Sequence, residues 1–205
     1  MTPAGPGQIA CLIGEKPLRT IALITIDTQR ITSRITFDKG TITSLASSPD
    51  GRTLFCAADN MVWKIPTSGG EPEKMIEGQS ISVDPDGRHL IVQVIETARS
   101  RLFRVPLNGG QKQEITLERP FELSTRGIGP QAIRSGRVLV VLNAADSWNN
   151  TAGMIDLDTG HVTRWKLDYS GDFQGLAWTG DGQITAIAFG TRSDLWKFQP
   201  RTSKK

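Results

Sequence analysis

The chain has 205 residues, with 24 lysines and arginines against 21 aspartates and glutamates, so its formal net charge is only +3. This length suits one domain and leaves no room for a second catalytic domain beside it. The even charge balance argues against a nucleic-acid-binding surface. No segment approaches the roughly 20 apolar residues that span a bilayer. Residues 1–20 also lack the basic region and sustained apolar run of a secretory signal, so no localisation follows.

Residues 9–38 form the first unit of the chain that resembles later ones. Ile24 to Thr32 reads ITIDTQRIT, and Ile155 to Thr163 reads IDLDTGHVT. We recognise neither a first strand nor an Asp-Gly turn in this unit. The sequence therefore predicts a partial repeat here, with strands on both sides of Asp27-Thr28-Gln29.

Two complete copies of the repeat follow, at residues 42–77 and 79–117. Each begins with a short strand and a Pro-Asp-Gly-Arg turn, which is a tight hairpin signal because glycine reaches positive φ at no steric cost. An apolar run follows in each copy, of a kind that suits strands buried on both faces. A second strand with an apolar-aromatic-basic-apolar pattern and a Gly-Gly turn complete the unit. These two strands are Leu54–Ala58 and Val62–Ile65 in one copy, and Leu90–Ile95 and Leu102–Val105 in the other.

The remaining units match more loosely. Residues 123–167 form a further full unit whose first turn is degraded to Arg134-Ser135-Gly136-Arg137, and residues 118–130 bring in a segment without repeat character. Residues 173–199 supply a partial unit of three strands, at Leu176, Ile184–Phe189 and Leu195–Phe198, with the first turn at Gly180-Asp181-Gly182-Gln183. Residues 200–205 form a polar tail.

This organisation predicts an all-β fold, a β-propeller of four-stranded antiparallel blades. Repeats of roughly 35 to 45 residues with short strands, glycine turns and no helical stretch are typical of propeller blades. We count about four to five blades in a single domain over residues 1–205, and leave open whether the ring is complete. Because an open array would expose strand edges, we expect the chain to be the C-terminal part of a larger propeller.

The turns SPDGRTL and DPDGRHL, each followed by an aromatic-basic strand and a Gly-Gly hairpin, resemble the TolB-type, WD-repeat-like β-propeller family. The resemblance covers residues 42–117 closely and 123–199 more loosely. It implies a bacterial propeller of one of three kinds: a standalone propeller, an accessory domain of prolyl-oligopeptidase-like serine hydrolases, or a sensor-like domain behind serine/threonine kinases or winged-helix regulators. The chain departs from the family in lacking a Trp-Asp dipeptide at any strand end.

Catalytic motifs are absent from the sequence. The two histidines, His89 and His161, fall in or beside hairpin turns, and there is no Gly-x-Ser-x-Gly elbow, Walker loop, His-Glu-x-x-His or Cys-x-x-Cys pattern. We therefore predict no enzyme, no catalytic residue, no cofactor and no metal site. Cys11 and Cys56 are interpreted as structural thiols.

Two recurring features have both a structural and a functional interpretation. Asp50, Asp86 and Asp181 recur at one end of the blades and could form a ring for a cation or ligand, although we favour turn capping. Lys64, Arg104 and Lys197 could form a basic stripe for an acidic partner, although we favour alkyl stems lying along the blade surface with the charges in water.

The loop from Asn143 to Gly153, NAADSWNNTAG, breaks the repeat and is the candidate partner-binding site, with Asp146, Trp148, Asn149 and Asn150 as its residues. Loops on propellers carry binding residues, and tryptophan is a favoured hot-spot residue. The alternative is a long hairpin whose tryptophan packs back onto its blade.

Together these features favour a non-catalytic binding or scaffold module, which by resemblance is a sensor or interaction domain of a bacterial regulatory protein such as a serine/threonine kinase. We expect a protein or peptide partner, with a small ligand as a further option, and neither nucleic acid nor a membrane span. Two alternatives remain: an accessory propeller of a serine hydrolase, and a lyase or hydrolase that acts within the propeller channel.

Overall fold

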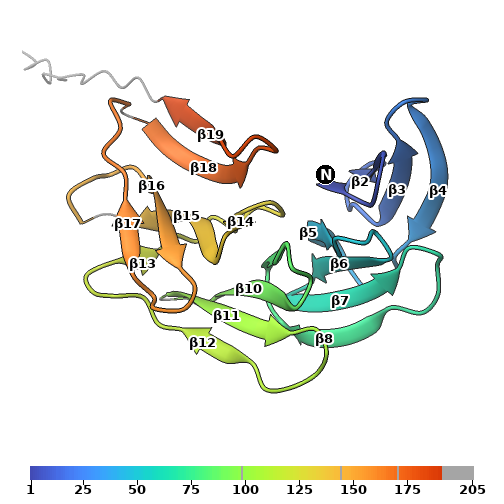
Figure 1. The fold of residues 1–205 in the computed structure, drawn as a ribbon, viewed down its shortest axis with the longest axis horizontal. Helices are drawn as coiled ribbons and strands as arrows, with labels where there is room; N and C mark the ends of the chain where they lie inside the picture. The colour runs from blue at the N-terminus through green and yellow to red at the C-terminus, as the bar shows by residue number, and fades with distance from the viewer. Residues whose placement is uncertain (98, 144, 170, 191–205) are drawn as a thin grey trace, which may run out of the picture.

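A computed structural model describes residues 1–97, 99–143, 145–169 and 171–190. The described residues form five antiparallel sheets and no helix, and none of them forms a segment long and helical enough to cross a membrane. Successive sheets follow one another around an open arc, from blade 1 (blue) to blade 5 (orange) in Figure 1. The prediction of an all-β propeller with four to five four-stranded blades is confirmed, with five sheets among the described residues.

Blades 1 to 3 are meanders in which strands adjacent in the sequence pair, whereas in blade 4 the first two strands both pair with the third. Blade 1 contains β1 (Thr2–Pro3), β2 (Gln8–Ile13), β3 (Thr20–Thr25) and β4 (Arg30–Thr36), and blade 2 contains β5 (Ile42–Ser47), β6 (Thr53–Ala58), β7 (Met61–Pro66) and β8 (Glu73–Glu77). Blade 3 contains β9 (Ser80–Val83), β10 (His89–Ile95), β11 (Ser100–Pro106) and β12 (Gln113–Ile115). Blade 4 contains β13 (Glu122–Leu123), β14 (Ile133–Arg134), β15 (Arg137–Asn143), β16 (Thr151–Asp156) and β17 (Val162–Arg164), and blade 5 contains β18 (Gly171–Trp178) and β19 (Ile184–Gly190).

The predicted glycine turns are confirmed by backbone geometry. The glycines of the four first turns, Gly51, Gly87, Gly136 and Gly182, all have φ between 70° and 84°. In the glycine-free turn of blade 1, Gln29 takes the left-handed conformation instead, with φ 54°. Positive φ at these positions turns the chain sharply enough to pair the flanking strands.

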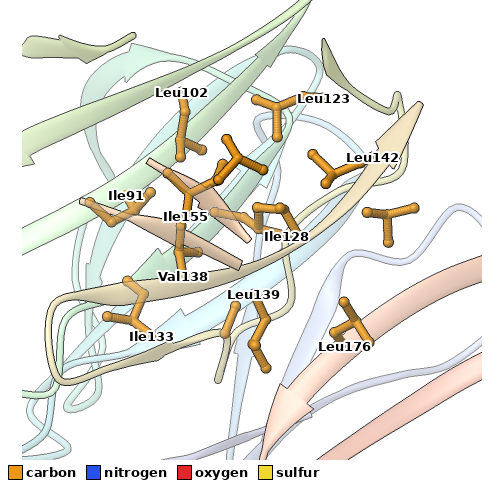
Figure 2. Close-up of a cluster of buried hydrophobic side chains, with 14 of the residues drawn as sticks. Ile91, Leu102, Leu123, Ile128, Ile133, Val138, Leu139, Leu142, Ile155 and Leu176 are labelled. Carbon is orange, nitrogen blue, oxygen red and sulfur yellow. The ribbon is translucent and has the colours of Figure 1, made fainter. Parts of the chain in front are cut away.

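Apolar side chains fill the spaces between neighbouring blades. Because strand residues alternate in direction, β6 directs Leu54 and Cys56 into a cluster with blade 1 and Phe55 into a cluster with blade 3. A third cluster joins blades 3, 4 and 5, and its members include Ile91, Leu139 and Leu176 (Figure 2). The core of the protein is therefore a series of layers between blades.

The prediction that blade 1 lacks its first strand is wrong. Thr2 and Pro3 pair with Ala10 and Ile9 as a two-residue β1, and the turn that follows uses Gly5 and Gly7 at positive φ. Thr2 and Ala4 are each 3% exposed, so this short strand is tightly packed. A strand of two residues has no periodicity to detect, but the paired glycines just before an apolar run were a usable turn signal.

The predicted burial of strand β19 is also wrong. Its apolar run predicted burial on both faces, yet Ile187 is 64% and Phe189 60% exposed. Within the described residues β19 pairs only with β18, so one of its edges and much of its surface have no covering element there. The predicted strand Leu195–Phe198 and the polar tail lie outside the described residues.

One of the two cysteines, Cys56, has the buried position expected of a structural thiol. Cys56 is fully buried in the cluster between blades 1 and 2, and burial raises the pKa of its thiol to about 12. Such a thiol stays protonated and unreactive at neutral pH. Cys11 is half-buried, and both cysteines are free.

Candidate binding site

The predicted loop forms the β15–β16 hairpin and projects Trp148 into solvent. Trp148 is 106% exposed, so it does not pack back onto its blade. Asp146 pairs with Arg164 at the end of β17, with 2.8 Å between Oδ1 and Nη1. The Asn149 amide donates a hydrogen bond to Ser147 Oγ at 3.1 Å. The loop thus presents an uncovered indole beside an anchored acid.

Asn150 anchors the other end of the loop to the next blade. Its backbone amide and side-chain Nδ2 donate to Asp172 Oδ1 of β18, at 2.9 and 2.7 Å. Asp172 also accepts hydrogen bonds from Arg126 and Gln174. Burial opposes ionisation of Asp172, but the donors on Asn150 and the charge of Arg126 outweigh it and hold the pKa of this carboxyl below its usual value. Arg126 and Asp172 were not among the predicted site residues, since neither belongs to the loop.

We expect Asp172→Ala to lower the free energy of unfolding by about 1 to 3 kcal/mol, because the amide donors of Asn150 lose their acceptor. Since the folded pKa is lowered, the carboxylate stabilises the fold above the ordinary aspartate value of about 3.9, and this contribution disappears as pH falls through the folded pKa. Urea melts should therefore separate wild type and variant at pH 7 and bring them together at the lowest pH at which both fold. An equal separation at both pH values would contradict this account.

Two further apolar side chains are exposed close to this boundary between blades 4 and 5. Leu167 and Tyr169, in the β17–β18 connection, are 52% and 47% exposed. Tyr169 is held by an edge-on contact with Phe173 of β18, with 5.8 Å between ring centroids. The Trp148 loop contacts β17 through Asp146 and β18 through Asn150, and these are the two strands that this connection joins.

The propeller axis holds two cavities, one toward each end of the inner strands. The first, of about 830 Å³, is lined by the β6–β7 turn and neighbouring segments, and Asp59 is the charged side chain among its described lining residues. The second, of about 510 Å³, lies at the Asp-Gly turns, where Arg134 is the charged side chain. Neither lining, as far as it is described, contains a pair of acids or an acid beside a histidine.

The segment without repeat character separates these cavities. Pro130 lines both of them, and the Ile128 amide donates to Ser80 Oγ at 3.0 Å and to Gln93 Oε1 at 3.1 Å. Gln93 is 1% exposed, so these hydrogen bonds satisfy a buried amide group. On the opposite side, an added Cβ at Gly129 would lie 2.8 Å from the Leu176 carbonyl oxygen of blade 5. This segment therefore bridges blades 3 and 5 between the two cavities.

The three recurring aspartates each bind within their own turn. Asp50, Asp86 and Asp181 accept hydrogen bonds from the backbone amides of Arg52, Arg88 and Gln183, at 3.0, 2.8 and 3.4 Å. This is the capping geometry that the favoured interpretation describes.

The basic side chains of the second strands are engaged by acids. Lys64 lies 3.2 Å from Glu73, and Arg104 lies 2.8 Å from Asp158 of the next blade. Lys197 lies outside the described residues. The two described positions are thus neutralised locally and do not present free charges to an acidic partner.

No family model matches the sequence, and no curated protein matches it either. Solved structures with the same fold include TolB from Acinetobacter baumannii, with a TM-score of 0.69, 16% identity and 92% of this chain aligned to 48% of that one. The β-propeller domain of Cps50 (Swd1) from Myceliophteria thermophila has a TM-score of 0.63 at 15% identity, over 92% of this chain and 60% of that one.

Hydrazine synthase from Kuenenia stuttgartiensis has a TM-score of 0.62 at 16% identity, over 90% of this chain and 54% of that one. The chain thus spans about half to three fifths of the length of these structures. Its fold is that of the TolB-type and WD-repeat propellers, as the turn motifs predicted. The presence of an enzyme in this group shows that the fold leaves catalysis open.

Proposed function

We propose that the chain is a non-catalytic β-propeller module that binds a protein or peptide partner through the loop of Asp146, Trp148, Asn149 and Asn150. The observation that carries this proposal is the full exposure of Trp148 on a loop whose two ends are held by polar contacts to β17 and β18. A large aromatic side chain presented by an ordered loop loses little conformational entropy on binding, so its burial contributes strongly to affinity.

Leu167 and Tyr169 extend this surface with apolar area, and the Asp146–Arg164 and Arg126–Asp172 pairs offer polar groups at its rim. This mixture of an apolar centre and a polar rim is typical of protein interfaces. The likeness to TolB-type turns supports the finer proposal that residues 1–205 form one propeller domain that serves as the sensor or interaction part of a bacterial regulatory protein such as a serine/threonine kinase. The axial cavities offer no acid–base pair within their described linings, which is why we prefer binding to channel catalysis.

Selection of peptides from a random display library on the purified chain tests this proposal. We expect Trp148→Ala to weaken the selected peptides by at least tenfold while the free energy of unfolding changes by less than about 0.5 kcal/mol. Ile26→Ala is the matched control, because Ile26 is 53% exposed on a turn of blade 1, far along the chain from the loop. Peptides that bind Trp148→Ala as tightly as wild type, or that lose affinity only with Ile26→Ala, would refute the assignment of the site.

A further inference from the structure

The first turn of blade 3 gathers three side chains that commonly bind metals. Asp84, Asp86 and His89 each offer a ligand atom, and these atoms all lie within 4.8 Å of one another. Asp84 and His89 are half-buried, whereas Asp86 is exposed. The three come from a single hairpin, with Asp84 before the turn, Asp86 within it and His89 at the start of β10.

The equivalent turns of blades 2 and 5 show what is unusual about this set. In blade 2, Ser48 Oγ donates to Asp50 Oδ1 at 2.6 Å and accepts the Thr53 amide at 3.0 Å. In blade 5, Thr179 Oγ1 likewise donates to Asp181. Blade 3 has Asp84 where these turns have a hydroxyl, and His89 where blade 2 has Thr53. A donor is thus replaced by a second carboxylate, and an imidazole is added beside it.

The two arginines near this second carboxylate are either exposed or paired with another acid. Arg88 lies 3.3 Å from Asp86, but its side chain is 78% exposed, so this pair is weak. Arg104, the other nearby cation, is engaged with Asp158 at 2.8 Å. The ligand oxygens of Asp84 and Asp86 lie within 4.8 Å of each other, and two ionised carboxylates this close repel. A bound cation would relieve that repulsion.

We propose that Asp84, Asp86 and His89 bind a divalent transition-metal ion, with zinc as the best match. Carboxylate oxygens and an imidazole nitrogen suit zinc, which accepts three protein ligands and a water, whereas calcium and magnesium prefer oxygen ligands alone. Zinc bonds of about 2.0 to 2.2 Å require ligand atoms roughly 3.3 Å apart, so the three side chains would close around the ion from their present separations of up to 4.8 Å. Asp86 can offer Oδ2 to the ion, because its Oδ1 accepts the Arg88 amide and the Arg88 guanidinium that faces Oδ2 is 78% exposed.

The metal would tie the turn to β10 and leave one coordination position open. The neighbours of Asp84 in the chain, Val83 and Pro85, line the 510 Å³ axial cavity at this end of the propeller. The site is separate from the Trp148 loop, which belongs to the β15–β16 hairpin of blade 4. This inference therefore stands independently of the proposed partner-binding function.

Isothermal titration of the chelator-treated chain with zinc chloride tests the site. We expect saturable binding of one zinc ion per chain, little heat from magnesium, and a rise in Tm of roughly 5 to 10 °C when free zinc reaches about one hundred times Kd. Asp84→Ser and His89→Thr install the blade 2 residues, so each should weaken zinc binding at least tenfold while the metal-free Tm stays level or rises.

His161→Gln is the matched control, because His161 lies 2.7 Å from Glu118 and is the other place where a histidine meets an acid. It should bind zinc as wild type does. The proposal is overturned if no saturable zinc binding occurs, if both blade 3 variants retain wild-type affinity, or if only His161→Gln loses it. Using two blade 3 variants keeps the test decisive. If Asp84→Ser does not fold, the zinc affinity of a folded His89→Thr still answers the question.

Discussion

Trp63→Ala is expected to lower the free energy of unfolding by about 3 to 5 kcal/mol, the usual loss for truncating a packed tryptophan. Trp63 lies on β7, on the same face as the fully buried Ile65, and packs against the cluster between blades 1 and 2. Its ring meets Phe37 of the preceding unit edge-on, with 5.8 Å between centroids and an interplanar angle of 72°. The substitution would therefore open a cavity between two blades.

Urea melts followed by circular dichroism measure this loss, with Trp148→Ala as the control. Both variants remove an indole, but Trp148 is fully exposed and its loss should change the free energy by less than about 0.5 kcal/mol. A Trp63→Ala loss below about 1 kcal/mol would show that the side chain faces water and that the blade register is wrong.

Gly160→Ala is expected to destabilise the chain by about 3 to 5 kcal/mol, because two costs combine. Gly160 has φ +73°, which disfavours any residue with a Cβ, and an added Cβ there would overlap the Thr116 carbonyl oxygen of blade 3. The neighbouring backbone cannot move away easily, since the Glu118 amide donates to the Gly160 carbonyl at 3.1 Å. This turn of blade 4 is therefore packed directly against the chain leaving blade 3.

Gly136→Ala separates these two costs. Gly136 has φ +70° but no atom within 4 Å of an added Cβ, so this variant carries the conformational cost alone, about 1 to 2 kcal/mol. Thermal or urea melts of the two variants should thus differ by at least about 1 kcal/mol. Equal losses would mean that the contact between blades 3 and 4 relaxes without cost.

The parts of the fold that depend on local chemistry could be predicted from the sequence. Gly51, Gly87, Gly136 and Gly182 were identified as turn residues, and all four have the positive φ that a tight hairpin demands. The strand β6 was identified from its unbroken apolar run, and its side chains do fill a cluster on each face. In both cases the pattern lies within a few residues, so tertiary contacts are not needed to find it.

Predictions were wrong where neighbouring elements decide the outcome. The strand β19 is as apolar as β6, but its burial depends on what covers it, and Ile187 and Phe189 are exposed. The strand β1 has two residues and forms because it pairs with β2. Residues 118–130 had no repeat pattern, and the position of Ile128 in this segment follows from hydrogen bonds to Ser80 and Gln93, more than 30 residues away.

The sequence by itself determined the repeat, the hairpins and the choice of the Trp148 loop, because turn geometry and strand periodicity are properties of short segments. Only the tertiary structure decided that Trp148 faces solvent and that Asp172, itself paired with Arg126, holds its loop. Exposure and charge pairing depend on groups brought together from distant positions, and no local pattern records that arrangement.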